Sequence, residues 1–138
     1  MKRWSILLGF WLGAIGAPCA AAFAQELLPM DTGGVDPDML KSMYGRWVVT
    51  DESEKKRCDV VLKGEETIGG SAIDVDPGCE KLFPVMGEIT AWRLMESWGI
   101  DLVDATRKTR VRFTTPDDRY VAIPEVDGIF TILQPEQE

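Results

Sequence analysis

Residues 109–115 read Thr-Arg-Val-Arg-Phe-Thr-Thr. In this stretch Val111 and Phe113 alternate with Arg110 and Arg112, so the apolar and the charged side chains fall on opposite faces of an extended chain. The alternation predicts a β-strand with one face against a hydrophobic core and the other face in water.

Seven other short segments show the same two-residue period, or a short apolar run between turn residues. They cover residues 46–50, 58–62, 71–75, 89–94, 100–104, 119–123 and 128–133. Residues typical of turns lie between them, among them Lys63-Gly64, Pro116-Asp117-Asp118 and Asp127-Gly128. Eight short strands at this spacing predict an all-β, antiparallel meander that closes into a small barrel or packs as a sandwich.

The first 24 residues have the composition of a secretory signal peptide. Lys2 and Arg3 form a basic start, residues 4–25 carry no charge, and Ala22-Phe23-Ala24 is a small-x-small cleavage site. Cleavage after Ala24 would leave a mature chain of residues 25–138, exported to the periplasm.

Two alternatives to cleavage remain open for this segment. Its uncharged residues 4–25 could nearly span a bilayer as an uncleaved anchor. Cys19 could instead carry a lipid and make the protein an outer-membrane lipoprotein, although Pro18 stands where such signals usually place a small residue. We expect contact with a membrane only in these two cases.

Length, charge and composition exclude several classes of protein. The chain has 138 residues, enough for one domain. It contains 15 Lys and Arg against 23 Asp and Glu, a net charge of −8. Loss of Lys2 and Arg3 with the signal peptide would change this net charge to −10. An acidic surface argues against nucleic acid as a partner and is compatible with a monomer. Because histidine is absent, His-dependent catalysis and His-ligated zinc or haem are excluded, whereas catalysis by carboxylates or Lys is not. An enzyme is still the class that the sequence favours least, and we expect no enzymatic activity, metal or cofactor.

Two cysteines remain after the signal peptide, Cys58 and Cys79. In an exported chain such a pair predicts a disulfide bond. Closing a loop of about 22 residues would stabilise the fold by roughly 3 kcal/mol through the entropy of the unfolded chain. A metal site on the two thiolates is the alternative, but two further ligands are not evident.

The mature chain divides into a leader, residues 25–38, and a barrel domain, residues 39–138. The leader contains two prolines, two adjacent glycines and four acids in fourteen residues, which predicts an irregular, mobile segment. Asp38 is a candidate N-cap for a short helix over residues 39–44 that ends at Gly45.

Three tryptophans lie beyond the signal peptide. Trp47 and Trp92 fall in predicted strands, so we expect them in the core, or as plugs at a barrel end, with their indole N–H groups bonded. Trp98 lies between Ser97 and Gly99 in a predicted turn, which makes it a candidate contact for a partner.

Three polar clusters have a functional and a structural interpretation, and we favour the structural one for each. Residues 74–78 lack the Gly and Glu of a calcium loop and predict a turn. The carboxylate pairs Glu65-Glu66 and Asp117-Asp118 lie in turn-like polar surroundings, where acid–base catalysis is not expected. Residues 55–57, Lys-Lys-Arg, predict a solvated loop, with contact to an acidic partner as the alternative.

The order of several motifs resembles a known family. The motifs are Gly45-Arg46-Trp47, Cys58-Asp59-Val60-Val61-Leu62, Cys79, Leu82, Trp92, residues 99–104 and the closing segment 128–133. Over residues 39–134 this order resembles the bacterial periplasmic inhibitors of alkaline, serralysin-type zinc metalloproteases, a family that includes related outer-membrane lipoproteins.

The resemblance implies an eight-stranded antiparallel up-and-down barrel with one disulfide bond. It also implies inhibition of a secreted zinc metalloprotease by an N-terminal trunk, which enters the active-site cleft and sits against the catalytic zinc. Here the trunk would be Gln25, Glu26, Leu27, Leu28 and Pro29. Glu26 or the main chain near Gln25 would face the zinc, although this leader is several residues longer than in the inhibitor type.

Two other functions remain open. An eight-stranded barrel can carry a small apolar ligand, although side chains are expected to fill the interior of a barrel of about 114 residues. An envelope-associated structural lipoprotein anchored through Cys19 is the second alternative.

Overall fold

The structure is a computed structural model that describes residues 27–135, together with Gly9 and Gly13. The rest of the predicted signal peptide, its cleavage site, Cys19, Gln25 and Glu26 lie outside the described residues. Within residues 27–135, no helix is both long and apolar enough to span a membrane.

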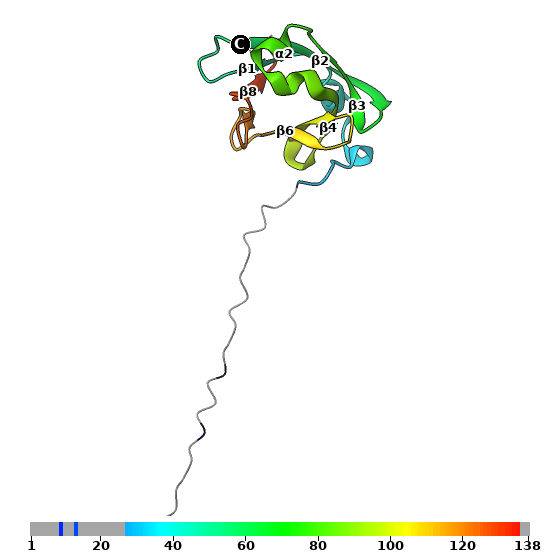
Figure 1. Cartoon of the computed structure of the whole chain (residues 1–138). Helices are drawn as coiled ribbons and strands as arrows, with labels where there is room; N and C mark the ends of the chain where they lie inside the picture. The colour runs from blue at the N-terminus through cyan, green and yellow to red at the C-terminus, as the bar shows by residue number, and fades with distance from the viewer. Residues whose placement is uncertain (1–8, 10–12, 14–26, 136–138) are drawn as a thin grey trace, which may run out of the picture.

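Eight strands form one antiparallel sheet in the order β7-β6-β5-β4-β3-β2-β1-β8. Strands β1 to β7 pair in sequence, and β8 returns to pair with β1, so the chain is an up-and-down meander curled on itself (Figure 1). This confirms the predicted all-β barrel. The strands are β1 Gly45–Thr50, β2 Arg57–Thr67, β3 Gly70–Val75, β4 Ile89–Leu94, β5 Ile100–Asp104, β6 Thr109–Thr114, β7 Val121–Ala122 and β8 Thr131–Leu133.

The two outer strands of the sheet approach each other, which makes the fold a nearly closed barrel rather than a sandwich. At this seam the Ala122 N–H donates to the Phe130 carbonyl oxygen at 2.8 Å, and the Phe130 N–H donates to the Thr50 carbonyl oxygen at 2.9 Å. The Thr131 hydroxyl also donates to the carbonyl oxygen of Tyr120. Closure leaves little unpaired sheet edge exposed.

The turn predicted at Lys63-Gly64 is wrong, because β2 continues through both residues. The irregularity there is a shift of the β2–β3 register between Leu62 and Glu66, which lets a long strand bend. Gly64 serves close packing: a Cβ at this position would lie 2.7 Å from Cε2 of Tyr44.

Strands β7 and β8 are shorter than the predicted segments 119–123 and 128–133. The chain just before β8 forms a tight turn, in which the Ile129 N–H donates to the Val126 carbonyl oxygen at 2.9 Å. Asp127 has a φ of 54°, and left-handed backbone of this kind does not continue a strand. The turn signal at Asp127-Gly128 is therefore confirmed, but the strand starts after it.

The short helix before β1 starts earlier than predicted. It is α1, Pro37–Lys41, and its N-cap is Asp36, whose carboxylate accepts from the Asp38 N–H at 2.8 Å. Proline favours the first helical position, where its missing N–H would have no partner in any case. Asp38 is therefore the second helical residue and not the cap.

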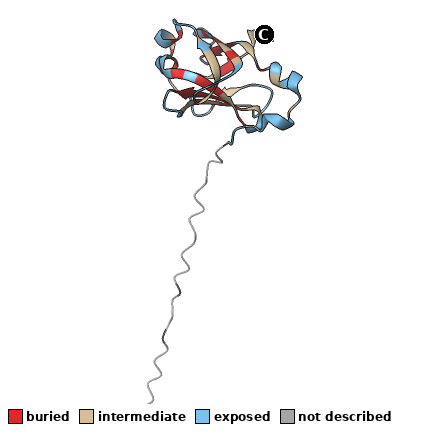
Figure 2. Cartoon of the chain, turned by 90° about the vertical axis from the view of Figure 1, so that its right-hand side faces the viewer, coloured by how far each residue is buried: buried red, intermediate tan, exposed pale blue. Residues whose placement is uncertain are grey.

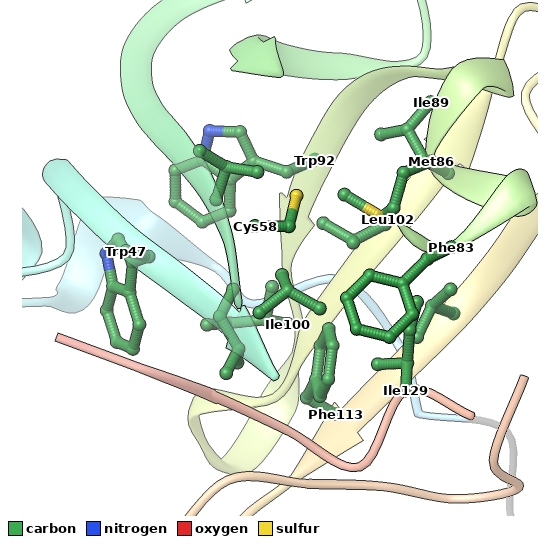
Figure 3. Packing of buried hydrophobic residues seen from close by; sticks show 14 of the residues in the cluster. Trp47, Cys58, Phe83, Met86, Ile89, Trp92, Ile100, Leu102, Phe113 and Ile129 are labelled. Atoms are coloured by element: carbon green, nitrogen blue, oxygen red, sulfur yellow. The ribbon is translucent and has the colours of Figure 1, made fainter. Parts of the chain in front are cut away.

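Apolar side chains fill the barrel interior, as Figure 3 shows, and buried residues concentrate on its inner face (Figure 2). The β3–β4 connection, α2 Cys79–Leu82 and η2 Pro84–Glu88, contributes Phe83, Val85 and Met86 to this core. Among the largest fully buried side chains are Trp92, Phe83, Phe113, Leu62, Met86, Ile100, Leu102, Ile129 and Ile132.

The predicted disulfide bond is confirmed. It joins Cys58 of β2 to Cys79 of α2 over a Cα–Cα distance of 5.0 Å. Both residues are buried, so the bond fastens the β3–β4 connection to the barrel wall. A covalent tie between two distant points of a small domain reduces the freedom of the unfolded chain and stabilises the fold.

A buried carboxylate lies on the outer side of β5, between two core-facing residues. The Asp101 side chain is 0% exposed. It accepts hydrogen bonds from Nε and Nη2 of Arg112, both at 2.8 Å, and from the Thr109 hydroxyl at 2.9 Å. The bidentate guanidinium contact neutralises the buried charge and links β5 to β6.

Candidate functional site

The leader joins the barrel at one end. In a meander, successive connections alternate between the two ends, which places the β4–β5 connection at one end and α2 with η2 at the other. The leader meets the β4–β5 connection, which contains the short 3-10 helix η3, Glu96–Trp98. We call the surface formed by residues 27–30 and 95–99 the leader end; in Figure 1 the start of the described chain, in blue, lies on this side of the barrel.

The leader pairs with the end of β4 as a short additional strand. The Glu96 N–H donates to the Leu28 carbonyl oxygen at 2.8 Å, and the Met30 N–H donates to the Leu94 carbonyl oxygen at 3.0 Å. Pro29 lies opposite Met95 in an antiparallel bridge. Both bonds flank Pro29, so its missing N–H costs nothing at this position.

This pairing corrects the prediction that the whole leader is irregular. Beyond Met30 the leader continues with η1, Thr32–Gly34, whose N-cap Asp31 accepts from the Gly33 N–H at 3.1 Å. Two of the acids that suggested an unstructured segment, Asp31 and Asp36, therefore serve as helix caps. Main-chain pairing at residues 28–30 was missed because it needs no particular side chain.

Side chains of the leader divide between the barrel and the solvent. A Cβ on Gly99 would lie 3.4 Å from Cδ1 of Leu27 and 3.3 Å from Cβ of Met95, so the leader packs closely over this glycine. Leu28, one residue further, is 60% exposed. Of the predicted trunk, Leu27 thus faces the barrel, and Leu28 and Pro29 present exposed apolar surface.

The connection that receives the leader has an unusual backbone. Ser97 and Trp98 have φ values of 58° and 63°, a left-handed conformation that costs energy for residues with side chains. The Met95 N–H donates to the Gly99 carbonyl oxygen at 2.7 Å, and the Tyr120 hydroxyl donates to the Trp98 carbonyl oxygen at 2.6 Å. These bonds hold the turn in its strained shape.

The predicted partner contact Trp98 is half-buried and packs against the core. Its contact with a partner stays a prediction. Tyr120, which no sequence pattern indicated, joins this turn to the interior: its ring meets Trp47 edge-on, with centroids 5.5 Å apart. Burial raises the pKa of Tyr120 to about 12, so its hydroxyl keeps the proton that it donates.

Trp47 and Trp92 are both buried, and each indole N–H has a main-chain acceptor. Trp47 Nε1 donates to the Met43 carbonyl oxygen at 2.9 Å, next to the leader end. Trp92 Nε1 donates to the Lys63 carbonyl oxygen, also at 2.9 Å. Trp47 therefore links β1 to the segment before it, and Trp92 links β4 to β2.

The other candidate clusters have local structural roles. Asp76 accepts from the Gly78 N–H at 2.8 Å within a turn, and the described part of the chain holds no group of three or more Cys, Asp or Glu residues arranged for a metal ion. Asp117 accepts from the Arg119 N–H at 2.9 Å in an exposed turn. The pair Glu65-Glu66 is exposed on β2 rather than in a turn.

The packing gives no support to a ligand carrier. Side chains occupy the barrel interior (Figure 3). A hollow of about 500 Å³ lies beside the β7–β8 seam, and its lining includes the charged residues Glu54, Arg57, Asp118 and Arg119. Such a lining does not suit a purely apolar ligand.

Taken together, the fold and the leader end define a small disulfide-bonded β-barrel that holds an N-terminal strand on one end. The family described as protease inhibitor Inh matches residues 38–133, which covers the barrel from α1 to β8. The chain belongs to this family of protease inhibitors, and its partner is a protease. A search of curated proteins finds no match to the chain.

Proposed function

We propose that this protein inhibits zinc metalloproteases of the serralysin type, and that its N-terminal segment occupies the active-site cleft of the protease. Membership of the inhibitor family supplies the general activity. The class of protease rests on the resemblance in motif order described above. The blocking mechanism is supported by one observation, the pairing of the leader with the end of β4.

Pairing of this kind suits an inhibitor because it lowers the cost of binding. A free peptide loses conformational freedom when it enters a cleft, and a segment already held in an extended form loses less. The disulfide bond and the packed core give the segment a rigid base. Hydrogen bonds at Leu28 and Met30 fix the direction in which the chain leaves that base.

The residues before Leu27 carry the groups that would meet the zinc. Gln25 and Glu26 lie outside the described residues, and they offer a carboxylate, carbonyl oxygens and, after cleavage at Ala24, a terminal amine. Zinc accepts oxygen and nitrogen ligands of these kinds. An N-terminal glutamine can cyclise, which would remove the amine and leave the oxygen atoms as ligands.

We place this inhibitor in the periplasm, where a signal peptide would deliver it. There it would protect the envelope from protease that is active before export. A lipid on Cys19 would anchor the same domain at the outer membrane. The mass of the mature protein distinguishes the two, because a lipoprotein would begin at Cys19 and carry acyl chains.

The proposal is tested by titrating a serralysin-type zinc protease with the oxidised mature protein, residues 25–138, and trypsin in parallel. We expect stoichiometric inhibition of the metalloprotease and none of trypsin. Inhibition of both enzymes would contradict a zinc-directed mechanism, and inhibition of neither would contradict the proposed target.

A further inference from the structure

We propose that the turn at residues 95–99 positions the inhibitory segment: it clamps the main chain at Leu28 and Met30, so that only the residues before Leu27 enter the protease cleft. The inference rests on the proposed function and goes beyond it, because it assigns a positioning role to a turn that need not touch the zinc.

The direction in which the leader pairs with β4 determines where the N-terminal segment points. The leader runs antiparallel to the end of β4, with Met30 opposite Leu94 and Leu28 opposite Glu96. Toward its N-terminus, the leader therefore runs past the last residue of β4 and away from the strand. Pairing at two successive acceptor and donor sites fixes both the position and the orientation of this exit.

Hydrogen bonds within residues 95–99, and one from Tyr120, hold the turn that forms the clamp. The turn closes through the bond from the Met95 N–H to the Gly99 carbonyl oxygen, 2.7 Å, and the Gly99 N–H donates to the Glu96 carbonyl oxygen at 3.3 Å. The Tyr120 hydroxyl holds the Trp98 carbonyl oxygen at 2.6 Å. A left-handed pair of non-glycine residues persists only when its surroundings hold it, which is what these bonds do.

The clamp limits the number of leader residues that can project from the barrel. With cleavage after Ala24, only Gln25 and Glu26 precede the packed residue Leu27, and two extended residues reach about 7 Å. The greater length of this leader is used after the clamp, where η1 and α1 lead the chain to β1. A longer leader therefore does not produce a longer projecting segment.

Leu28 lies where the leader's bonded main chain ends and the segment proposed to enter the protease cleft begins. Its carbonyl oxygen accepts the Glu96 N–H, while its side chain is 60% exposed. An exposed leucine beside the inserted segment is placed to contact apolar surface of the protease. In this proposal residues 27–30 place the predicted trunk, and insertion is left to the residues that precede them.

One substitution removes one of the two bonds of the clamp with little other change. Glu96→Pro deletes the N–H that bonds the Leu28 carbonyl oxygen. Glu96 is the first residue of η3, where proline is tolerated, and Met95 before it is extended, with φ −103° and ψ 164°, as a residue before proline prefers. Glu96→Ala is the matched control, because it removes the same carboxylate and keeps the N–H.

Two measurements test the inference on these variants in the mature protein. We expect Glu96→Pro to weaken inhibition of the metalloprotease about tenfold or more relative to Glu96→Ala. In the free protein, we expect hydrogen exchange of the Met30 N–H to accelerate about tenfold or more in the same variant, with exchange in β1 unchanged.

Equal inhibition by the two variants would overturn the positioning role, whatever the exchange shows. Weaker inhibition with unchanged Met30 exchange would also overturn it, because the Glu96 main chain would then act by direct contact with the protease. If the wild-type protein does not inhibit the metalloprotease while Met30 is protected, the clamp exists but the proposed function, and the inhibitory role given to the clamp, are wrong.

Discussion

The backbone N–H of Glu96 donates to the carbonyl oxygen of Leu28 at 2.8 Å, so the leader of this inhibitor is bonded to the barrel before any protease is present. The bond joins residues that are 68 positions apart in the chain. It gives the N-terminal segment a defined starting point on a rigid body.

Replacing the exposed leucine of the leader should weaken inhibition without affecting the fold. Leu28→Ala removes apolar surface that is already in solvent, so we expect the melting temperature to stay within about 1 °C. Inhibition should weaken by about tenfold, because the side chain borders the inserted segment. Ile123→Ala is the control: Ile123 is also exposed, but it follows β7 at the opposite end of the barrel. An equal effect of the two variants would contradict this account.

Removing one hydroxyl should loosen the turn that receives the leader. Tyr120→Phe deletes the donor to the Trp98 carbonyl oxygen and keeps the ring contact with Trp47. We expect the free energy of unfolding in urea to fall by about 1 kcal/mol, the usual worth of such a bond. Inhibition should weaken several-fold; unchanged potency and stability would show that the turn does not need this bond.

The buried ion pair on the outer side of the barrel should matter for stability and not for binding. Asp101→Ala leaves Arg112 without its bidentate partner, and we expect a loss of about 3 kcal/mol in the free energy of unfolding. At a temperature where the variant is folded, its inhibition constant should match that of the wild type. A folded variant with weakened inhibition would place this face in the protease interface.

Asp104 should make the stability depend on pH in acid. The Thr106 hydroxyl, then the N–H groups of Lys108 and Thr106 and the Arg110 guanidinium, lower the pKa of Asp104 to about 2, against the opposing effect of desolvation. Its contribution is therefore complete above the unfolded pKa near 4 and is lost as the pH falls toward about 2. The stability difference between wild type and Asp104→Asn, from urea unfolding, should shrink across this window; a constant difference would contradict the assignment.

Much of the barrel could be predicted from residue patterns because its strands satisfy local rules. The alternation of Val111 and Phe113 with two arginines marks β6, which spans Thr109–Thr114 in the structure. The pair Cys58 and Cys79 forms the expected disulfide bond. The period of apolar side chains and the number of cysteines can be read from the sequence itself. Predicting the strands and the disulfide bond from them therefore requires no information about tertiary contacts.

The errors occur where a distant contact decides the local structure. Lys63-Gly64 has the composition of a turn, but packing of the Tyr44 ring over Gly64 keeps these residues in a strand. Leader pairing with β4 uses main-chain atoms alone, and no side-chain pattern reports it. The Tyr120 hydroxyl supports the leader end by donating to the carbonyl oxygen of Trp98. A bond to a main-chain atom requires no particular residue at position 98, so the sequence pattern does not predict it either.

The central claim is that a short segment before Leu27 blocks the protease, and one deletion tests it most directly. The mature protein, residues 25–138, is compared with residues 27–138 in titrations of a serralysin-type zinc protease. Since the described core, disulfide bond and leader pairing all begin at or after Leu27, we predict an unchanged melting temperature. We also predict that the shorter protein inhibits at least about a hundredfold less well. Equal inhibition by the two proteins would contradict the account, because the protease would then be blocked by the barrel itself.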